Sequence, residues 1–205
     1  MKGKYAYSLA LEPGAAPAAL EAVGKCVQAH LGQWRQDGLE WIRVYRECVE
    51  GREYAFMFIA ASVAKDEGAA LLSELAASGL LDGWQAARHV YEFKLHPGDS
   101  YDGLKTQGII IGVREGKLEE YIRLHDEQPQ IIHDLCYQNG FRKSSIFVAD
   151  LHKQYLLQFQ DFSGEENPAL YENETYLEWL DVTGACQAPL PGEKFWKPME
   201  SVLEV

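Results

Sequence analysis

The chain has 205 residues, of which 47% are hydrophobic and 24% are charged, a balance that supports a packed core and excludes an intrinsically disordered chain. Its 31 acidic residues against 19 basic ones give a net charge of -12, and such a field repels phosphate, so nucleic acid and anionic membranes are poor partners. No apolar run reaches the roughly 20 residues that a membrane-spanning helix needs, and residues 1–7 lack the apolar stretch of a signal peptide. We therefore expect a cytoplasmic protein.

The cysteines are isolated from one another along the chain, at Cys26, Cys48, Cys136 and Cys186. They form no CxxC pair and have no histidine nearby at metal-ligand spacing. We expect reduced thiols and no metal site.

The first half of the chain has the pattern of a βαββαβ unit. Apolar alternation predicts strands over residues 5–11, 39–45, 53–60 and 89–95. Helical spacing predicts helices over residues 15–31 and 66–77.

The same order follows a polar stretch rich in glycine and proline at residues 96–106, which we interpret as a linker. Strands are expected over residues 108–113, 142–148, 154–162 and 201–205, and helices over residues 115–138 and 169–180.

A steady offset between the halves indicates a duplication. Asp37-Gly38 precedes Asn139-Gly140 by about 102 positions, and the second half carries an insertion around residues 187–194. We predict an α+β fold in which tandem ferredoxin-like βαββαβ repeats pack sheet to sheet as an α+β barrel. The predicted domains are a degenerate first half at residues 1–95, a linker at 96–106 and a second half at 107–205. The repeats would form an internal pseudo-dimer, and a homodimer stays open.

Tyr121 and His125 are four residues apart in a predicted helix, so their side chains share one face, one turn apart. An imidazole titrates near neutral pH and can give or take a proton, while a phenol can hold a substrate hydroxyl beside it. The spacing also fits a pair that only lines the sheet-facing side of an amphipathic helix. His133 falls on nearly the same face, eight residues farther on.

Phe195 and Trp196 are adjacent aromatic residues just before the last predicted strand. Such pairs stack on the apolar faces of sugars or of flat ligands, and tryptophan adds an N–H donor. Core packing is the alternative interpretation.

These features resemble the L-rhamnose mutarotase family of dimeric α+β barrels over roughly residues 108–205. The resemblance rests on Tyr121-Ile122-Arg123-Leu124-His125, on the helix end at Asn139-Gly140 and on Phe195-Trp196-Lys197-Pro198-Met199. It implies that Tyr121 binds the sugar, that His125 is the general acid, and that Phe195 and Trp196 complete the sugar site.

The chain departs from the family pattern at three places. Pro129 follows the histidine by four residues instead of two, Ser144 stands where a sugar-contacting tyrosine is expected, and Phe195 replaces a tryptophan. Anomer interconversion needs one proton delivered to the ring oxygen and one removed from the anomeric hydroxyl, so it requires neither a metal nor an organic cofactor. The second proton-transfer group is left open between Asp126, Asp161 and an ordered water.

The first half lacks the acid–base pair, because the equivalent positions are Ala19 and Val23. His30 and Trp34 lie four apart near the end of its helix. Trp84, with Arg88 and His89, occupies the place of the C-terminal aromatic cluster. We interpret these residues as packing and surface charge, and the first half as a built-in partner for the second.

Three functions remain. The first is a mutarotase-like enzyme, of the aldose 1-epimerase type, that acts on a rhamnose-like deoxy sugar. The second is a non-catalytic small-molecule-binding or scaffold protein on the same barrel. The third, ranked last because it rests on fold alone, is a cofactor-independent monooxygenase.

Overall fold

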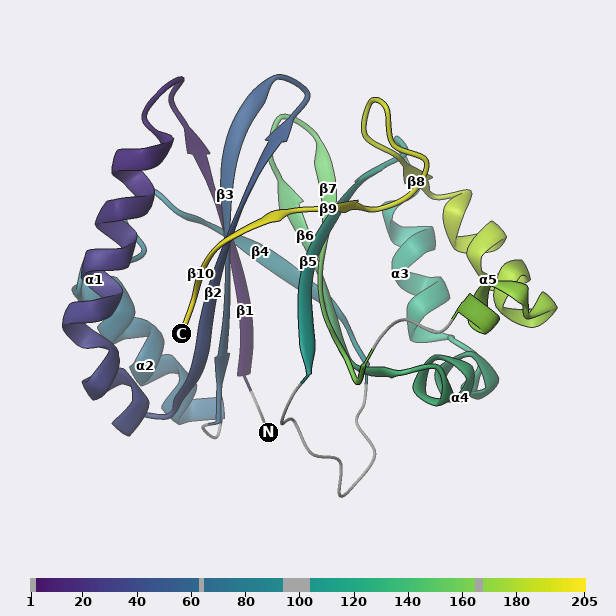
Figure 1. Ribbon diagram of the computed structural model, residues 1–205, viewed down its shortest axis with the longest axis horizontal. Helices are drawn as coiled ribbons and strands as arrows, with labels where there is room; N and C mark the ends of the chain where they lie inside the picture. The colour runs from purple at the N-terminus through teal and green to yellow at the C-terminus, as the bar shows by residue number, and fades with distance from the viewer. Residues whose placement is uncertain (1–2, 63–64, 94–103, 165–167) are drawn as a thin grey trace. The chain divides into compact units, whose positions relative to one another are not determined.

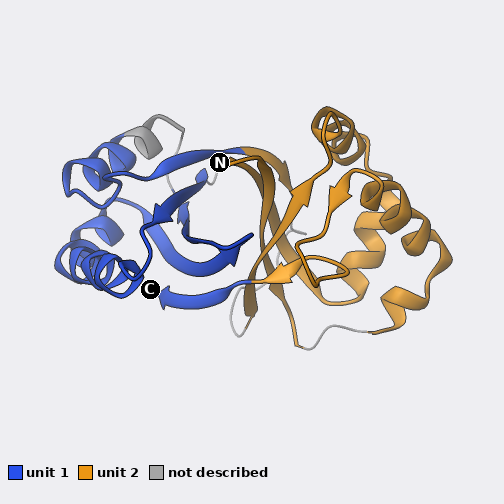
Figure 2. Cartoon of the chain, turned by 90° about the horizontal axis from the view of Figure 1, so that it is seen from above, with its two compact units in different colours: residues 1–88, 199–205 blue, residues 89–198 orange. Residues whose placement is uncertain are grey.

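The computed structural model describes residues 3–62, 65–93, 104–164 and 168–205. The chain divides into two compact units (Figure 2). Unit 1 comprises Met1–Arg88 and Met199–Val205, and unit 2 comprises His89–Pro198. Most of the predicted linker at residues 96–106 lies outside the described residues, and its last two positions belong to a strand that begins at Lys105.

Unit 1 is an antiparallel sheet with two helices on one face (Figure 1). The helices are α1 (Ala16–Gln36) and α2 (Lys65–Ala77). The strands, in the sheet order β10-β2-β3-β1-β4, are β10 (Glu200–Glu204), β2 (Leu39–Val49), β3 (Arg52–Ala61), β1 (Gly3–Leu11) and β4 (Gln85–Glu92). Alternate residues of β3, such as Met57 and Ile59, pack with Val27 and Trp34 of α1 in one apolar core.

Unit 2 repeats this plan with the sheet order β4-β6-β7-β5-β8 and with β9 paired to β5. The strands are β5 (Lys105–Val113), β6 (Phe141–Asp150), β7 (Gln154–Phe162), β8 (Gln187–Ala188) and β9 (Lys197–Pro198). The helices are α3 (Leu118–Asp126), α4 (Gln130–Gln138) and α5 (Glu174–Gly184), with a short 3-10 helix η1 (Pro168–Glu172).

The helix-facing core of unit 2 consists of two apolar clusters. The α3 cluster is formed by Ile111, Val113, Leu118, Tyr121, Ile146, Val148, Leu156 and Cys186. The α4 cluster is formed by Phe93, Ile132, Cys136, Phe141, Phe162, Leu170 and Tyr176. Unit 1 has one large cluster beneath both of its helices. Some residues of the sheet and of the helix layer lie between the two clusters and belong to neither, and we call this interval of the fold the gap.

Two strands do not stay with their own half of the sequence. Ala87 at the start of β4 pairs with Ala6 of β1 in unit 1, whereas the backbone N–H of Phe93, just past the end of β4, donates to the carbonyl of Ser144 in unit 2. The expectation that residues 201–205 complete the second half is wrong, because β10 pairs with β2 of unit 1. Without β10, the outer edge of β2 would have unpaired backbone N–H and C=O groups, and the pairing with β10 supplies their hydrogen-bond partners.

The predicted helix over residues 115–138 is two helices, α3 and α4, separated at Glu127–Pro129. Proline disfavours helical backbone at the preceding residue, and Pro129 itself has an extended ψ of 138° as the N-cap of α4. The predicted helix over residues 169–180 is likewise η1 followed by α5, which begins after Asn173, whose side chain accepts from the backbone N–H of Tyr176.

Several local features recur at the same offset in both halves. Gly38 and Gly140 both follow a helix with positive φ, 96° and 99°, and their carbonyls accept from the backbone N–H of Ser62 and Ser163. The β2–β3 and β6–β7 pairings both shift register near the start of the first strand. The two halves therefore fold to the same local plan.

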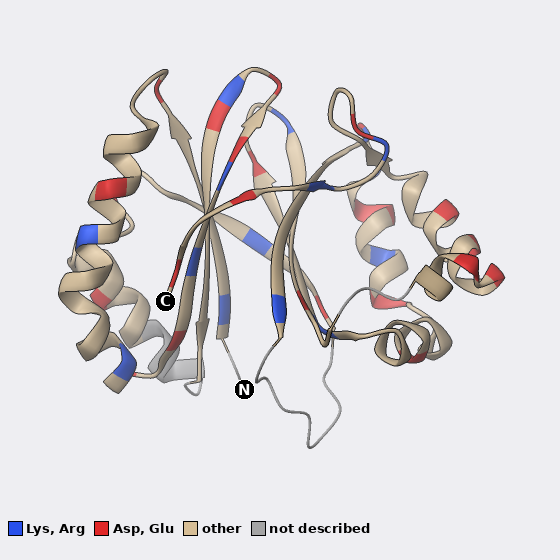
Figure 3. Ribbon diagram, in the orientation of Figure 1, with Lys and Arg blue, Asp and Glu red and all other residues tan. Residues whose placement is uncertain are grey.

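The outer helix of unit 2 is acidic. Glu174, Glu178 and Asp181 of α5 are exposed, and this helix carries neither lysine nor arginine (Figure 3). Within the described part of the chain, none of the helices has the length and hydropathy to cross a membrane.

Candidate active site

Helix α3 places Tyr121 and His125 on one face, as their spacing predicts, with ring centroids 4.2 Å apart. The Nδ1 atom of His125 lies 3.0 Å from the backbone carbonyl of Tyr121. Because a carbonyl can only accept, Nδ1 carries the proton and Nε2 carries the lone pair. No group in the described residues hydrogen-bonds to Nε2, so this nitrogen is available to a ligand.

Aromatic rings surround His125 on three sides. Tyr91 of β4 and Trp179 of α5 present their edges at centroid distances of 4.9 Å and 5.4 Å, and Tyr121 is the third. This burial lowers the pKa of His125 from 6.5 to about 4, although the bond to the Tyr121 carbonyl acts in the opposite direction. The imidazole is therefore neutral at physiological pH.

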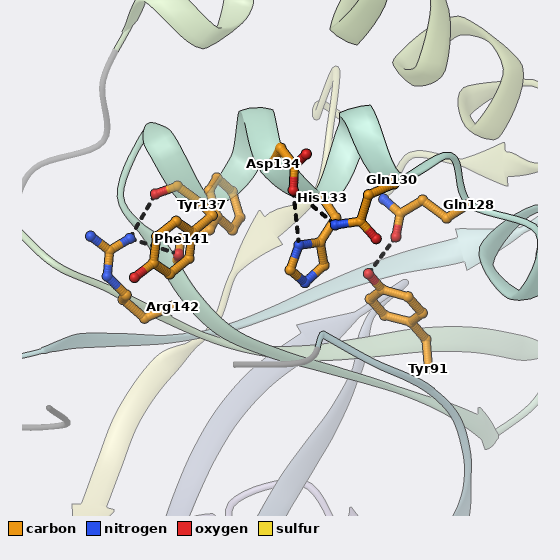
Figure 4. A network of polar contacts seen from close by, with 8 residues as sticks. All are labelled: Tyr91, Gln128, Gln130, His133, Asp134, Tyr137, Phe141 and Arg142. Carbon is orange, nitrogen blue, oxygen red and sulfur yellow. Dashed lines mark hydrogen bonds and ion pairs between the residues drawn. The ribbon is translucent and has the colours of Figure 1, made fainter. Parts of the chain in front are cut away.

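Tyr91 links this ring cluster to the break between α3 and α4. Its hydroxyl donates to Oε1 of Gln128 at 2.5 Å, and Gln128 lies in the short connection that Pro129 creates (Figure 4). Burial raises the pKa of Tyr91 well above its usual range, so the phenol keeps its proton. The helix break thus supplies a fixed hydrogen-bond partner beside His125.

Tyr121 is 1% exposed and belongs to the α3 cluster. Its hydroxyl hydrogen-bonds with the Gln187 side chain, and burial raises its pKa. The ring packs against His125, while the hydroxyl is directed to Gln187 of β8.

The predicted aromatic pair is divided in the structure. Trp196 packs against the α3 cluster, to which Tyr121 belongs. Phe195 is 74% exposed. Phe195 lies in a bend just before β9, so the two adjacent rings do not form one surface.

A band of polar residues crosses the helix-facing side of the unit 2 sheet. Gln160 pairs with Gln107 of β5 and with Ser144 of β6, and Gln158 lies two residues away on the same face. The side-chain amide of Gln158 donates to Oγ of Ser144 at 2.8 Å and to Oε1 of Gln160 at 3.1 Å. The amide of Gln160 donates to Oε1 of Gln107 at 3.2 Å. We call these four residues the glutamine band.

The glutamine band lies in the gap between the two apolar clusters. Along β7, Gln158 and Gln160 separate Leu156 of the α3 cluster from Phe162 of the α4 cluster. In the helix layer, the gap falls between Tyr121 of the α3 cluster and Ile132 of the α4 cluster, and His125 and Gln128 occur within it.

Tyr121 packs with Ile111 and Leu156 in the α3 cluster, and His125 lies one helical turn farther along α3, beside Tyr91. Tyr91 packs against both clusters and so forms a side of the same gap.

The two carboxylates considered for the second proton transfer, Asp126 and Asp161, both point away from the gap. Asp161 is 5% exposed and alternates with Gln160 along β7, so it faces away from the helices, where Oγ1 of Thr106 donates to it at 2.6 Å. Asp126 is exposed at the end of α3. Neither carboxylate faces the gap, whereas the Tyr91–Gln128 pair does.

His133 and His89 lie outside this arrangement. His133 of α4 stacks on Phe93 at a centroid distance of 4.0 Å and lies 3.9 Å from Oδ1 of Asp134 (Figure 4). The ring of His89 packs at a tilt against Phe147, and its Nε2 lies 3.3 Å from Glu92. No group of three potential ligands suited to a metal occurs among the described residues.

The first half has a filled core at the equivalent place. Ala19 and Val23 stand where the second half has Tyr121 and His125, and Val23 is part of the unit 1 core. His30 stacks on the buried Trp34 at 5.3 Å but is itself exposed. Trp84 packs into the unit 1 core, as Trp196 packs into the α3 cluster.

Sequence reasoning missed Tyr91, Gln128, Trp179 and the glutamine band. Gln128-Pro129 is a readable helix break, and alternate polar residues in the predicted strand 154–162 are a readable irregularity. Tyr91 and Trp179 had no such signal, because each comes from an element remote in sequence.

In comparisons with known proteins, a family model matches the second half of the chain. The family model described as L-rhamnose mutarotase matches residues 106–205. None of the curated proteins matches the chain in sequence.

Solved structures match the whole chain. The "putative monooxygenase" of Fusobacterium nucleatum subsp. nucleatum is similar over 99% of this chain and 93% of its own, with 8% sequence identity and a TM-score of 0.54. That of Lactobacillus acidophilus covers the same shares with 9% identity and a TM-score of 0.48. An anthrone oxidase-like protein covers 98% of this chain and 92% of its own with 12% identity and a TM-score of 0.47. The Fusobacterium likeness shows the fold alone, and the predicted fold class, an α+β fold of the barrel type, is confirmed.

Proposed function

We propose that the protein interconverts the anomers of a monosaccharide, a rhamnose-like deoxy sugar, by proton transfer through His125. The premise is that residues 106–205 match the family model described as L-rhamnose mutarotase. The observation that carries the proposal is the free Nε2 of His125, on an imidazole held in one tautomer by the Tyr121 carbonyl and enclosed by the rings of Tyr121, Tyr91 and Trp179. A neutral monosaccharide is the partner that this site suits.

Mutarotation opens the sugar ring at the anomeric carbon and closes it on the other face. The neutral Nε2 of His125 takes the proton of the anomeric hydroxyl as the bond between C1 and the ring oxygen breaks. The resulting imidazolium returns a proton to the ring oxygen, so the reaction needs no net gain or loss of protons. Because burial keeps the imidazolium acidic, with a pKa of about 4, the return step is favoured.

Tyr91 and Gln128 are the second polar pair in this scheme. The Tyr91 hydroxyl donates to Gln128, and its oxygen can accept from a sugar hydroxyl held beside His125. Trp179 and Tyr91 present apolar ring surface to the sugar face, a role that the resemblance gives to Phe195 and Trp196. Trp196 instead packs against the α3 cluster.

The test is exchange spectroscopy of anomeric protons by NMR, with L-rhamnose and other 6-deoxy sugars. His125→Gln is expected to lower the enzyme-dependent exchange rate about 100-fold or more, the usual contribution of general acid–base catalysis. His30→Gln is the matched control, because Nδ1 of His30 also bonds to the carbonyl four residues back, at 2.9 Å, and its ring also stacks on an aromatic. Absence of acceleration with any aldose would refute the proposal.

A non-catalytic binding protein is the second candidate. It is favoured by the Tyr121 hydroxyl, which is buried against Gln187 and so does not face a ligand. The same experiment separates the two, since saturation transfer to a bound sugar without anomer exchange supports binding alone. The monooxygenase alternative has only the likeness in fold to support it.

A further inference from the structure

We infer that the glutamine band is the specificity floor of the site, built to bind adjacent hydroxyls of an uncharged polyol and to reject phosphorylated or acidic sugars. The inference rests on the proposed location of the sugar site in unit 2 but does not depend on turnover. Its four residues, Gln107, Ser144, Gln158 and Gln160, have no role in the proton transfer described above.

The band is polar where packing would favour apolar residues. Position for position, unit 1 has Tyr5, Ile42, Met57 and Ile59, with the same pairings of Ile59 to Tyr5 and to Ile42. Met57 and Ile59 are fully buried in a core that closes over this face. The fold therefore does not require polar side chains here, and their presence in only one half needs another explanation.

Amides withdrawn from water cost stability unless they are hydrogen-bonded. Ser144 and Gln160 are buried and Gln107 and Gln158 are half-buried, and this set is only partly bonded within itself. The internal bonds use the amide nitrogens of Gln158 and Gln160, the Ser144 hydroxyl oxygen, and the amide oxygens of Gln160 and Gln107. They leave the amide nitrogen of Gln107 and the oxygen of Gln158 without a partner among the described residues. One donor and one acceptor on neighbouring strands match two vicinal hydroxyls, each of which can donate and accept.

The charges around the band favour an uncharged ligand. The band contains no lysine or arginine, and His125 of the same unit is neutral at physiological pH because its pKa is about 4. Helix α5 of this unit is acidic on its exposed side, with Glu174, Glu178 and Asp181 (Figure 3). Phosphate and carboxylate sites in proteins are instead built from arginine, lysine or clustered backbone N–H groups.

The experiment replaces the band with the residues that unit 1 uses. In Gln158→Met/Gln160→Ile, binding of neutral aldoses is measured by saturation-transfer difference NMR and titration calorimetry, with L-rhamnose, L-fucose and D-galactose as probes. D-glucuronate and glucose 6-phosphate are the charged probes. Gln154→Met is the matched control, because Gln154 lies on the same strand but is exposed.

The wild-type protein is expected to bind at least one neutral aldose more tightly than either charged probe. The double variant is expected to bind that aldose about tenfold or more weakly while its melting temperature stays equal or rises. Ser144→Ala, which removes one hydroxyl, gives a smaller loss and serves if the double variant does not fold.

An unchanged dissociation constant in the folded variants would overturn the inference, as would preferred binding of a charged sugar or binding of no sugar at all. Failure of the proposed function has a different signature. A wild-type protein that binds a neutral aldose through the band but does not accelerate anomer exchange refutes mutarotation and supports the specificity floor.

Discussion

The two halves of this chain share one local plan and differ in what they place between helix and sheet. In unit 1, α1 is a continuous helix from Ala16 to Gln36 and covers an apolar face. In unit 2, the equivalent helix breaks at Pro129, and the helix-facing side of the sheet carries the glutamine band. A continuous helix on apolar residues stabilises the fold, whereas the broken helix and the polar band are where we propose that a ligand binds.

In the function that we propose, the ligand site of unit 2 occupies a place that apolar packing fills in unit 1. Unit 1 then contributes more stability through apolar burial, whereas unit 2 buries less apolar surface there and carries the function. Substitutions that give a position in one half the residue of the other half test this view through their effects on stability.

Tyr121→Ala gives the second half the residue that the first half has at Ala19. Because the Tyr121 ring is 1% exposed within the α3 cluster, its removal leaves a cavity and is expected to lower the free energy of unfolding by about 3–5 kcal/mol. Tyr121→Phe, which loses only the bond to Gln187, is expected to cost about 1 kcal/mol. Urea unfolding measures both. Equal losses in the two variants would show that the ring does not support the core.

His125→Val gives the second half the residue that the first half has at Val23, and it sharpens the comparison through pH. The native state holds the pKa of His125 at about 4, against 6.5 for an unperturbed histidine, so the unfolded chain binds the proton more readily. The contribution of this group is fully present above about pH 6.5 and is lost as the pH falls to about 4, a loss of about 3 kcal/mol.

Chemical denaturation of the wild type and of His125→Val between pH 4 and pH 7 checks this expectation. The variant should lose less stability over that range, and His30→Gln, which alters an exposed histidine, should follow the wild type. Parallel curves for the wild type and His125→Val would contradict the buried, neutral imidazole.

Phe195→Ala is the smallest change. The side chain is 74% exposed, so the free energy of unfolding should change by less than about 0.5 kcal/mol, whereas Trp196→Ala, which removes a ring packed on the α3 cluster, should be clearly destabilising. Thermal unfolding of the two variants compares them directly. A large loss for Phe195→Ala would place this ring in a packed environment.

Much of the candidate site follows from local rules. The spacing of Tyr121 and His125 predicts a shared helix face, and the structure places their rings 4.2 Å apart. The offset between Gly38 and Gly140 predicts matching helix ends, and both glycines have positive φ. These expectations depend on helical or turn geometry within a few residues, which sequence specifies well.

Other parts of the site depend on contacts that are distant in sequence. Tyr91 belongs to the first half by sequence, yet its ring lies beside His125 because β4 continues into unit 2. Strand β10 leaves the second half for the edge of β2 in the same way. Apolar alternation identifies a strand but does not say which neighbour it pairs with.

The sequence by itself determined the α+β pattern, the two similar halves and the face shared by Tyr121 and His125, because helix and strand periodicities are local properties of the backbone. Only the tertiary structure decided that Tyr91 and Trp179 enclose the imidazole, that Asp161 lies on the sheet face away from the helices, and that a hydrogen-bonded polar band separates the two apolar clusters of unit 2. Burial sets the low pKa of His125, and burial depends on elements that come together from across the chain.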